Sequence, residues 1–137
     1  MSIKAVILAA GEGSRMRPLT HNKPKVMLPV ANKPLLEHLI IEIAKAGVKD
    51  VILVTGYQQE KIVEYFNHGE NWGVHIDYCR QPERRGTADA VRMVAQIVSD
   101  TFLVMNGDIV VEYQDINKMI AHDCVTIGAF PVEKTEG

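Results

Sequence analysis

Apolar and polar positions follow two different periods along this chain. Short runs of consecutive apolar residues are typical of strands that are covered on both faces. They predict strands at residues 3–9, 51–55, 74–79, 102–105 and 124–130. Between them lie longer segments with an apolar residue every three or four positions, which is typical of helices with one buried side. These predict helices at residues 33–46, 58–67, 88–99 and 113–122.

Each helical segment has an apolar side that should face a core. The first helix is expected to open at Lys33-Pro34 and to stop at Gly47, and Thr87 is a suitable N-cap for the third. The long segment 10–32 contains three prolines and is expected to be a loop. The predicted inward positions are Leu35, Leu36, Leu39, Ile40, Ile43 and Ala44, then Ile62, Val63 and Phe66, then Val91, Val94, Ala95 and Val98.

Strands and helices alternate throughout, which indicates an α/β fold. We expect a mostly parallel sheet with helices on both faces, joined by right-handed crossovers, in a Rossmann-like three-layer arrangement. The 137 residues, of which 47% are hydrophobic and 23% charged, suit one domain over residues 1–137. No apolar run approaches the roughly 18 residues of a membrane span and no signal peptide is evident, so we expect a cytoplasmic protein that binds no membrane.

The remaining composition narrows the chemistry. Cys79 and Cys124 lie in apolar runs and are expected to be reduced and buried, and the five histidines form no cluster, so no zinc site is predicted. Residues 1–36 hold six Lys or Arg and one acidic residue, although the whole chain has a formal net charge of −2. Such a local basic segment favours an anion site over a nucleic-acid surface.

A glycine-rich turn follows the first predicted strand. Gly11 and Gly13 leave backbone N–H groups uncovered, and Arg15 and Lys25 lie nearby, a combination suited to phosphates. The spacing lacks the third glycine of a dinucleotide-binding fingerprint and is not a Walker P-loop. In parallel sheets, ligands bind beyond the carboxyl ends of the strands. We therefore expect this turn to share one sheet edge with the loop 80–87 and with Asn106–Asp108.

Three stretches together resemble the sugar-phosphate nucleotidyltransferases, also called nucleotide-sugar pyrophosphorylases. They are Leu8–Met16 continued by Lys23–Glu37, Gln81 followed by Gly86-Thr87-Ala88, and Asn106-Gly107-Asp108. Members of this family condense a nucleoside triphosphate with a sugar 1-phosphate and release pyrophosphate. The resemblance implies a fold of the nucleotide-diphospho-sugar transferase type. It also implies that these residues are the nucleotide-binding part of a longer catalytic domain, whose sugar-binding half is absent from this chain.

The resemblance assigns a role to particular residues. Arg15 and Lys25 are the expected catalytic residues, with Arg15 suited to the β- and γ-phosphates and Lys25 to the α-phosphate. Asp108 is the expected ligand of Mg²⁺, the cofactor that the family implies. Gln81 and Gly86 are expected to read the base. The nucleotide-binding set comprises Leu8, Ala9, Ala10, Gly11, Gly13, Ser14, Arg15, Lys25, Gln81, Gly86, Thr87, Asn106, Gly107 and Asp108.

Several functions remain open at this level. UTP or dTTP is the favoured nucleotide, and glucose 1-phosphate or N-acetylglucosamine 1-phosphate the favoured sugar. A guanylyltransferase for mannose 1-phosphate and a non-catalytic nucleotide-binding or regulatory subunit are the alternatives. A dehydrogenase-like dinucleotide binder is disfavoured because the third glycine and the acidic ribose-binding residue are missing. Association of copies into a homo-oligomer also stays open.

Overall fold

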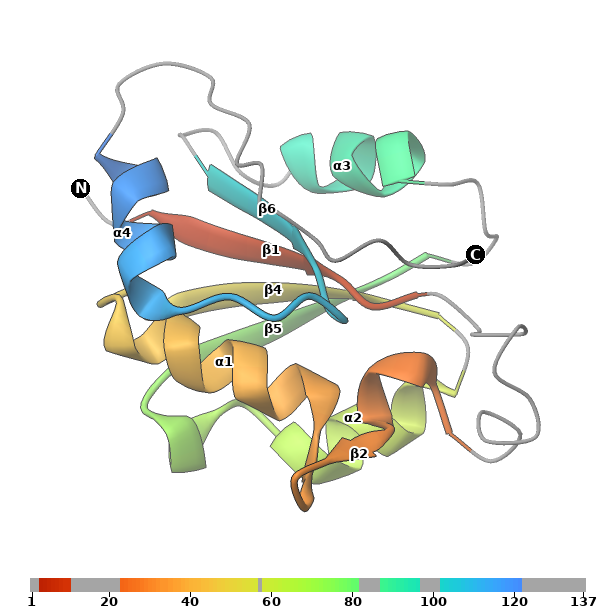
Figure 1. Ribbon diagram of the computed structural model, residues 1–137. Coiled ribbons are helices and arrows are strands. Elements are labelled where there is room, and N and C mark those ends of the chain that lie inside the picture. The colour runs from red at the N-terminus through yellow and green to blue at the C-terminus, as the bar shows by residue number, and fades with distance from the viewer. Residues whose placement is uncertain (1–2, 11–22, 57, 82–86, 97–101, 122–137) are drawn as a thin grey trace, which may run out of the picture.

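The computed structural model describes residues 3–10, 23–56, 58–81, 87–96 and 102–121. Strands and helices alternate along these residues (Figure 1). In chain order the elements are β1 (Lys4–Leu8), η2 (Lys25–Met27), β2 (Pro29–Val30), β3 (Lys33–Pro34), α1 (Leu35–Lys45), β4 (Asp50–Thr55), α2 (Gln59–Phe66), η3 (Glu70–Trp72), β5 (His75–Arg80), α3 (Thr87–Ala95), β6 (Phe102–Asn106) and α4 (Tyr113–Ile120). The predicted strand 124–130, with Cys124, lies outside the described residues.

A parallel sheet with the strand order β5-β4-β1-β6 forms the middle layer. Helix α3 covers one face, and α1, α2 and α4 cover the other (Figure 1). The side chains of β1 alternate between these layers, because successive residues of a strand point to opposite faces. Ala5 and Ile7 belong to the larger apolar cluster with α1 and α2, whereas Val6 packs with Val94 of α3. The predicted α/β class with a covered parallel sheet is thus confirmed.

The first helix begins later than the sequence pattern predicts. Lys33-Pro34 is not helical but forms β3, which pairs antiparallel with β2 in a two-stranded hairpin. Ala31 and Asn32, at its tip, both have positive φ angles, of 52° and 67°. Such a two-residue turn matches the twist of a hairpin, and the proline in β3 sits where a missing N–H is tolerated. Helix α1 therefore runs from Leu35 to Lys45, and Gly47 ends it with a φ of 89°.

Some predicted inward positions are also wrong. Val63 is 36% exposed, because the short helix α2 turns Ile62 and Phe66 to the core and leaves Val63 beside that stripe. Ala95 is exposed at the end of α3, and Cys79 is only half-buried. Leu35, Ala44 and Val91 are intermediate, and Val98 lies outside the described residues. The fully buried positions are Leu36, Leu39, Ile40, Ile43, Ile62, Phe66 and Val94.

No helix in the described ranges is both long and apolar enough to cross a membrane.

Candidate functional site

The carboxyl ends of β1 and β6 form the point where the strand order reverses. From β1 the chain passes to β4 and β5 on one side, and then returns to β6 on the other. Leu8, the last residue of β1, pairs with Asn106, the last residue of β6. The Gly107 N–H then donates to the Leu8 carbonyl oxygen at 3.0 Å. Parallel sheets bind ligands at such a reversal, so Leu8, Asn106 and Gly107 lie where the sequence predicted them.

Gly107 allows the segment η2 to rest directly on this junction. A Cβ atom at position 107 would lie 2.8 Å from Cγ1 of Val26 and 3.3 Å from the Leu8 carbonyl oxygen. Val26 and Met27 are buried in the main apolar cluster, so η2 is part of the core. This close packing fixes the backbone of Lys25, the first residue of η2, and so limits the positions that its side chain can occupy.

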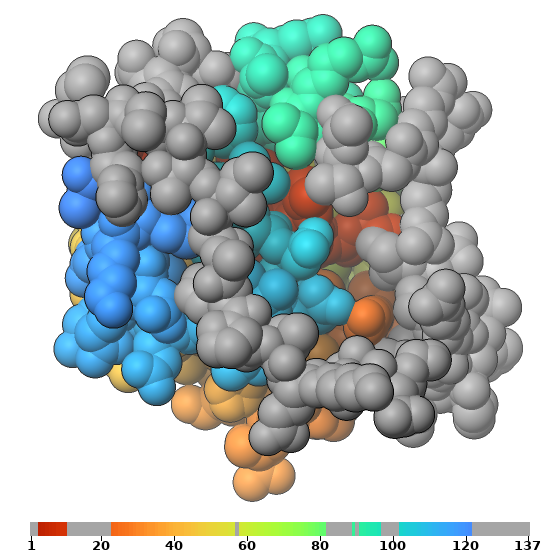
Figure 2. All heavy atoms as spheres, turned by 45° about the horizontal axis from the view of Figure 1, so that its top comes forward, coloured from red at the N-terminus to blue at the C-terminus, as the bar shows by residue number. Residues whose placement is uncertain are grey.

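Lys25 and Asp108 meet at the reversal point. The Lys25 Nζ lies 2.7 Å from Asp108 Oδ2, and the two side chains are 38% and 33% exposed. In Figure 2 the orange atoms of the segment containing Lys25 lie beside the cyan atoms of β6 and the residues after it. An ion pair this exposed to water adds only about 0–1 kcal/mol to stability. Lys25 and Asp108 can therefore break this contact and bind a ligand instead, with little loss of folding stability.

Helix α1 anchors the backbone on both sides of this ion pair. The hairpin after η2 is tied to it by two hydrogen bonds, from the Leu35 N–H to the Leu28 carbonyl at 3.0 Å and from His38 Nε2 to the Val30 carbonyl at 2.6 Å. On the other side, Glu42 Oε1 accepts the N–H of Tyr113 at 3.0 Å. That bond satisfies a donor in the first turn of α4, the helix that follows Asp108.

A buried carboxylate holds the start of α1. Glu37 is 7% exposed and accepts a hydrogen bond from the Tyr65 hydroxyl of α2, and its other oxygen lies 3.9 Å from Lys33 Nζ. The hydrogen bond to Glu37, then burial and the charge of Glu37, raise the pKa of the Tyr65 phenol. Glu37 of α1 therefore connects this helix to α2 through Tyr65 and to the hairpin through Lys33.

Gln81 lies at the same sheet edge, after β5 and two strands away from β1. Its N–H donates to the Thr55 carbonyl at 2.8 Å, which places it level with the end of β4. Its side chain is buried, and Nε2 donates to Asp89 Oδ2 at 3.0 Å. Asp89, in the first turn of α3, also accepts from Arg92 through Oδ1 at 3.0 Å. Sequence reasoning missed Asp89; its signal was an acid in the first turn of the helix that follows the loop 80–87.

The other predicted site residues fall into two groups. Ala9 donates its N–H to the Val54 carbonyl at 2.8 Å, and Ala10 packs against Gly56, so the chain leaves β1 close to the end of β4. Thr87 is the first residue of α3. The remaining predicted residues lie outside the described ranges: Gly11, Gly13, Ser14, Arg15 and Gly86.

The oxygen chemistry of Asp108 fits a magnesium ion. Mg²⁺ is usually held by one or two carboxylates and by phosphate oxygens of the substrate. Asp108 offers one carboxylate, partly exposed, at the ligand-binding edge of the sheet. Within the described ranges no three His, Cys, Asp or Glu side chains gather as an all-protein metal site would require. A metal at Asp108 would thus depend on a phosphate ligand for its other oxygens.

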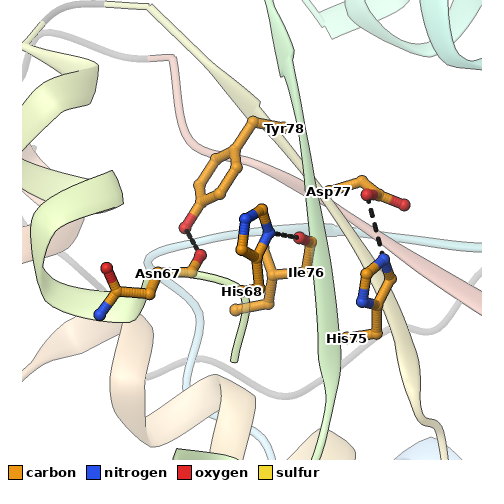
Figure 3. Close-up of polar contacts among 6 residues, drawn as sticks. All are labelled: Asn67, His68, His75, Ile76, Asp77 and Tyr78. Atoms are coloured by element: carbon orange, nitrogen blue, oxygen red, sulfur yellow. Dashed lines mark hydrogen bonds and ion pairs between the residues drawn. The ribbon is translucent and has the colours of Figure 1, made fainter. Parts of the chain in front are cut away.

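Two exposed histidines, His68 after α2 and His75 on the edge strand β5, lie close together on the surface. Figure 3 shows His75 beside Asp77, two residues along the same face of β5, at 3.2 Å. His68 Nδ1 bonds the Ile76 carbonyl at 3.4 Å, and the Tyr78 hydroxyl donates to the Asn67 carbonyl. These contacts join β5 to the turn after α2. Nearby, burial raises the pKa of the Cys79 thiol, which keeps it protonated at neutral pH.

The fold and the site define an α/β protein with a partly exposed ion pair at the reversal point of its sheet. The family model described as nucleotidyl transferase matches residues 4–134. The chain therefore belongs to the nucleotidyl transferase family, and the resemblance to sugar-phosphate nucleotidyltransferases is confirmed.

Named relatives of this chain are longer proteins that it matches in part. The chain is 48% identical over 109 residues to the bifunctional protein GlmU of Methanocaldococcus jannaschii, covering 79% of this chain and 25% of that protein. It is 40% identical over 106 residues to the UTP–glucose-1-phosphate uridylyltransferase AglF of Haloferax volcanii, covering 77% and 43%. The chain thus spans less than half the length of these relatives.

A solved structure agrees with the fold. A Bacillus anthracis protein, described as a glucose-1-phosphate thymidylyltransferase and crystallised with sucrose, superposes with a TM-score of 0.80 at 29% identity. The match covers 87% of this chain and 49% of that one.

Proposed function

We propose that this chain binds the nucleotide for transfer of a nucleotidyl group from a nucleoside triphosphate to a sugar 1-phosphate, with release of pyrophosphate. The observation that carries the proposal is the Lys25–Asp108 pair at the carboxyl ends of β1 and β6. A cation suited to a phosphate and a carboxylate suited to Mg²⁺ are adjacent there. Membership of the family supports this reading.

The favoured nucleotide is UTP or dTTP, and the favoured acceptor is glucose 1-phosphate or N-acetylglucosamine 1-phosphate. The names of two relatives support this choice, because one is a uridylyltransferase and the other is described as a thymidylyltransferase, both for glucose 1-phosphate. Gln81 is suited to contact a base, although it does not by itself select one. Its amide carries both a donor and an acceptor, and it lies at the same sheet edge as the charged pair.

The chemistry requires positioning more than it requires a reactive side chain. An oxygen of the sugar phosphate attacks the α-phosphorus in line, the bond to the bridging oxygen breaks, and pyrophosphate leaves with its electrons. Lys25 would turn from Asp108 to an α-phosphate oxygen and stabilise the charge that develops there. Asp108 would hold Mg²⁺, which supplies positive charge to the phosphates when bound. Arg15 would bind the β- and γ-phosphates, and the backbone after Leu8 would line the triphosphate.

Replacement of Lys25 by Ala tests this role. In a protein that carries this chain together with the sugar-binding half, we expect pyrophosphate release with UTP, glucose 1-phosphate and Mg²⁺ to fall by about 100-fold or more, because a charge aimed at the transition state is lost. Nucleotide affinity, measured by calorimetry, should fall much less. Lys23→Ala is the matched control, since Lys23 is exposed two residues away.

Two results would contradict the proposal in different ways. If Lys25→Ala and Lys23→Ala lower turnover equally, Lys25 has no special role in the reaction. If the wild-type chain binds the nucleotide and Lys25→Ala changes only its affinity, the chain is a binding or regulatory module.

A further inference from the structure

The amide of Gln81 is held in one orientation by a carboxylate. Asp89 Oδ2 lies 3.0 Å from the Gln81 amide nitrogen. A carboxylate can only accept hydrogen bonds, so the group facing Asp89 must be the NH₂ and not the carbonyl oxygen. The assignment of the two amide atoms is therefore dictated by chemistry.

The surroundings of this contact keep it in place. The side chain of Gln81 is 6% exposed, and its N–H is bonded to Thr55 of the neighbouring strand. On the other side, Arg92 donates to the second oxygen of Asp89 at 3.0 Å. The sheet thus fixes the Gln81 end of the contact, and Asp89, whose side chain is 15% exposed, is positioned by the helix α3.

A fixed amide distinguishes two kinds of base edge. Uracil, thymine and guanine present a ring N–H beside a carbonyl oxygen, which we call the lactam edge. Cytosine and adenine present a ring nitrogen acceptor beside an amino group, which we call the amidine edge. A glutamine amide can pair with both atoms of either edge, but only by exchanging the positions of its oxygen and nitrogen. An amide that cannot turn over matches one edge and opposes the other.

We propose that Asp89 is a positioning residue that fixes the Gln81 amide and so restricts the site to nucleotides with a lactam edge. This inference rests on the proposed function, in which Gln81 reads the base. The lactam edge is favoured because uracil and thymine, the bases implied by the names of two relatives, both carry it. Asp89 acts through Gln81 and needs no contact with the nucleotide.

Replacement of Asp89 by Asn tests the inference with little change in shape. An Asn side chain can donate or accept, so the Gln81 amide can turn over and pair with either edge. Calorimetry with Mg²⁺ and UTP, GTP, CTP or ATP gives a Kd for each nucleotide. In the wild type we expect lactam nucleotides to bind about tenfold or more tightly than amidine nucleotides. In the mismatched complex the Gln81 donor would face a donor of the base and its acceptor would face an acceptor. In Asp89→Asn the ratio of the Kd for amidine nucleotides to the Kd for lactam nucleotides should fall to near one.

Two further variants separate positioning from general damage. Asp115→Asn removes an acid from the first turn of α4, on the opposite face of the sheet, and should leave the ratio unchanged. In a Gln81→Ala background, Asp89→Asn should have no further effect on the ratio, because the residue it positions is gone. If Asp89→Asn does not fold, Arg92→Gln should lower the ratio in the same direction but by less.

The outcomes distinguish this inference from the proposed function. If the wild type binds triphosphates and Asp89→Asn keeps the full preference for lactam nucleotides, the inference is wrong and the proposed function stands. A wild type that prefers CTP or ATP would overturn the inference and the choice of UTP or dTTP, but would leave the proposed nucleotidyl transfer standing. If no triphosphate binds the wild type, both fail together.

Discussion

Gly107 offers the most direct test of how packing positions the charged pair. In Gly107→Ala, the new Cβ would lie 2.8 Å from Val26 Cγ1, whereas ordinary contacts begin at 3.4 Å. Val26 is 5% exposed and cannot swing into water. The clash of about 0.6 Å must therefore be relieved by moving η2 away from the β1–β6 junction.

The expected effects follow from that displacement. Overpacking of a core by one methyl group costs about 1–3 kcal/mol, which should lower the Tm of a chain of this size by roughly 3–15 °C. Because η2 carries Lys25, its displacement should also lower turnover, by about 10-fold to 100-fold. Thermal unfolding and the pyrophosphate-release assay measure the two effects.

Two variants complete this experiment. Gly47→Ala meets no atom within 4 Å but must adopt a φ of 89°. It should lose about 1 kcal/mol of stability with no change in turnover. Val26→Ala, added to Gly107→Ala, removes the clashing methyl group and should recover part of the lost activity. Normal Tm and normal turnover in Gly107→Ala would refute the argument.

Two further predictions concern residues outside the charged pair. Glu42→Ala should lower the free energy of unfolding by about 1 kcal/mol, because the Tyr113 N–H loses its acceptor; a urea titration with no shift in midpoint would contradict this. Burial, followed by the charge of Glu70, raises the pKa of Tyr78 to about 12 from its usual 10.0. Folding therefore favours the protonated phenol, and this stabilisation, fully present below pH 10, should be lost as the pH rises through about 12. In Tyr78→Phe, the fall of Tm over that alkaline range should be shallower than in the wild type, and an identical profile would exclude this role.

The fold was predictable from sequence where one physical rule dominated. Covered parallel strands need runs of apolar residues, and helices on a sheet need one apolar side, so β1, β4 and α1 could be located within a few residues. The hairpin of β2 and β3 was missed because its strands have two residues each and contain prolines. No periodicity can develop over so short a distance.

The site was predictable only at the level of its sheet edge. The rule for ligand binding in parallel sheets placed Asp108 and Gln81 at one edge, and the structure adds that Lys25 lies 2.7 Å from Asp108. Sequence alone could not show that Gly107 makes room for Val26, or that Asp89 holds Gln81. Both are contacts between segments whose distance depends on the finished tertiary structure. The roles of the predicted site residues all remain predictions, and Arg15 and Gly86 also lie outside the described ranges.

The strand order has a consequence for how the protein folds. Strands β1, β4 and β5 are neighbours in the sheet and follow one another along the chain, so we expect them to pair early. The β1–β6 ladder joins Lys4 to Phe102, on the order of a hundred residues later, and must close a far longer loop. The junction that carries Lys25 and Asp108 should therefore be among the last parts to form during synthesis. A nucleotide would then bind only after this junction has formed, and its binding would stabilise the contact that is slowest to assemble.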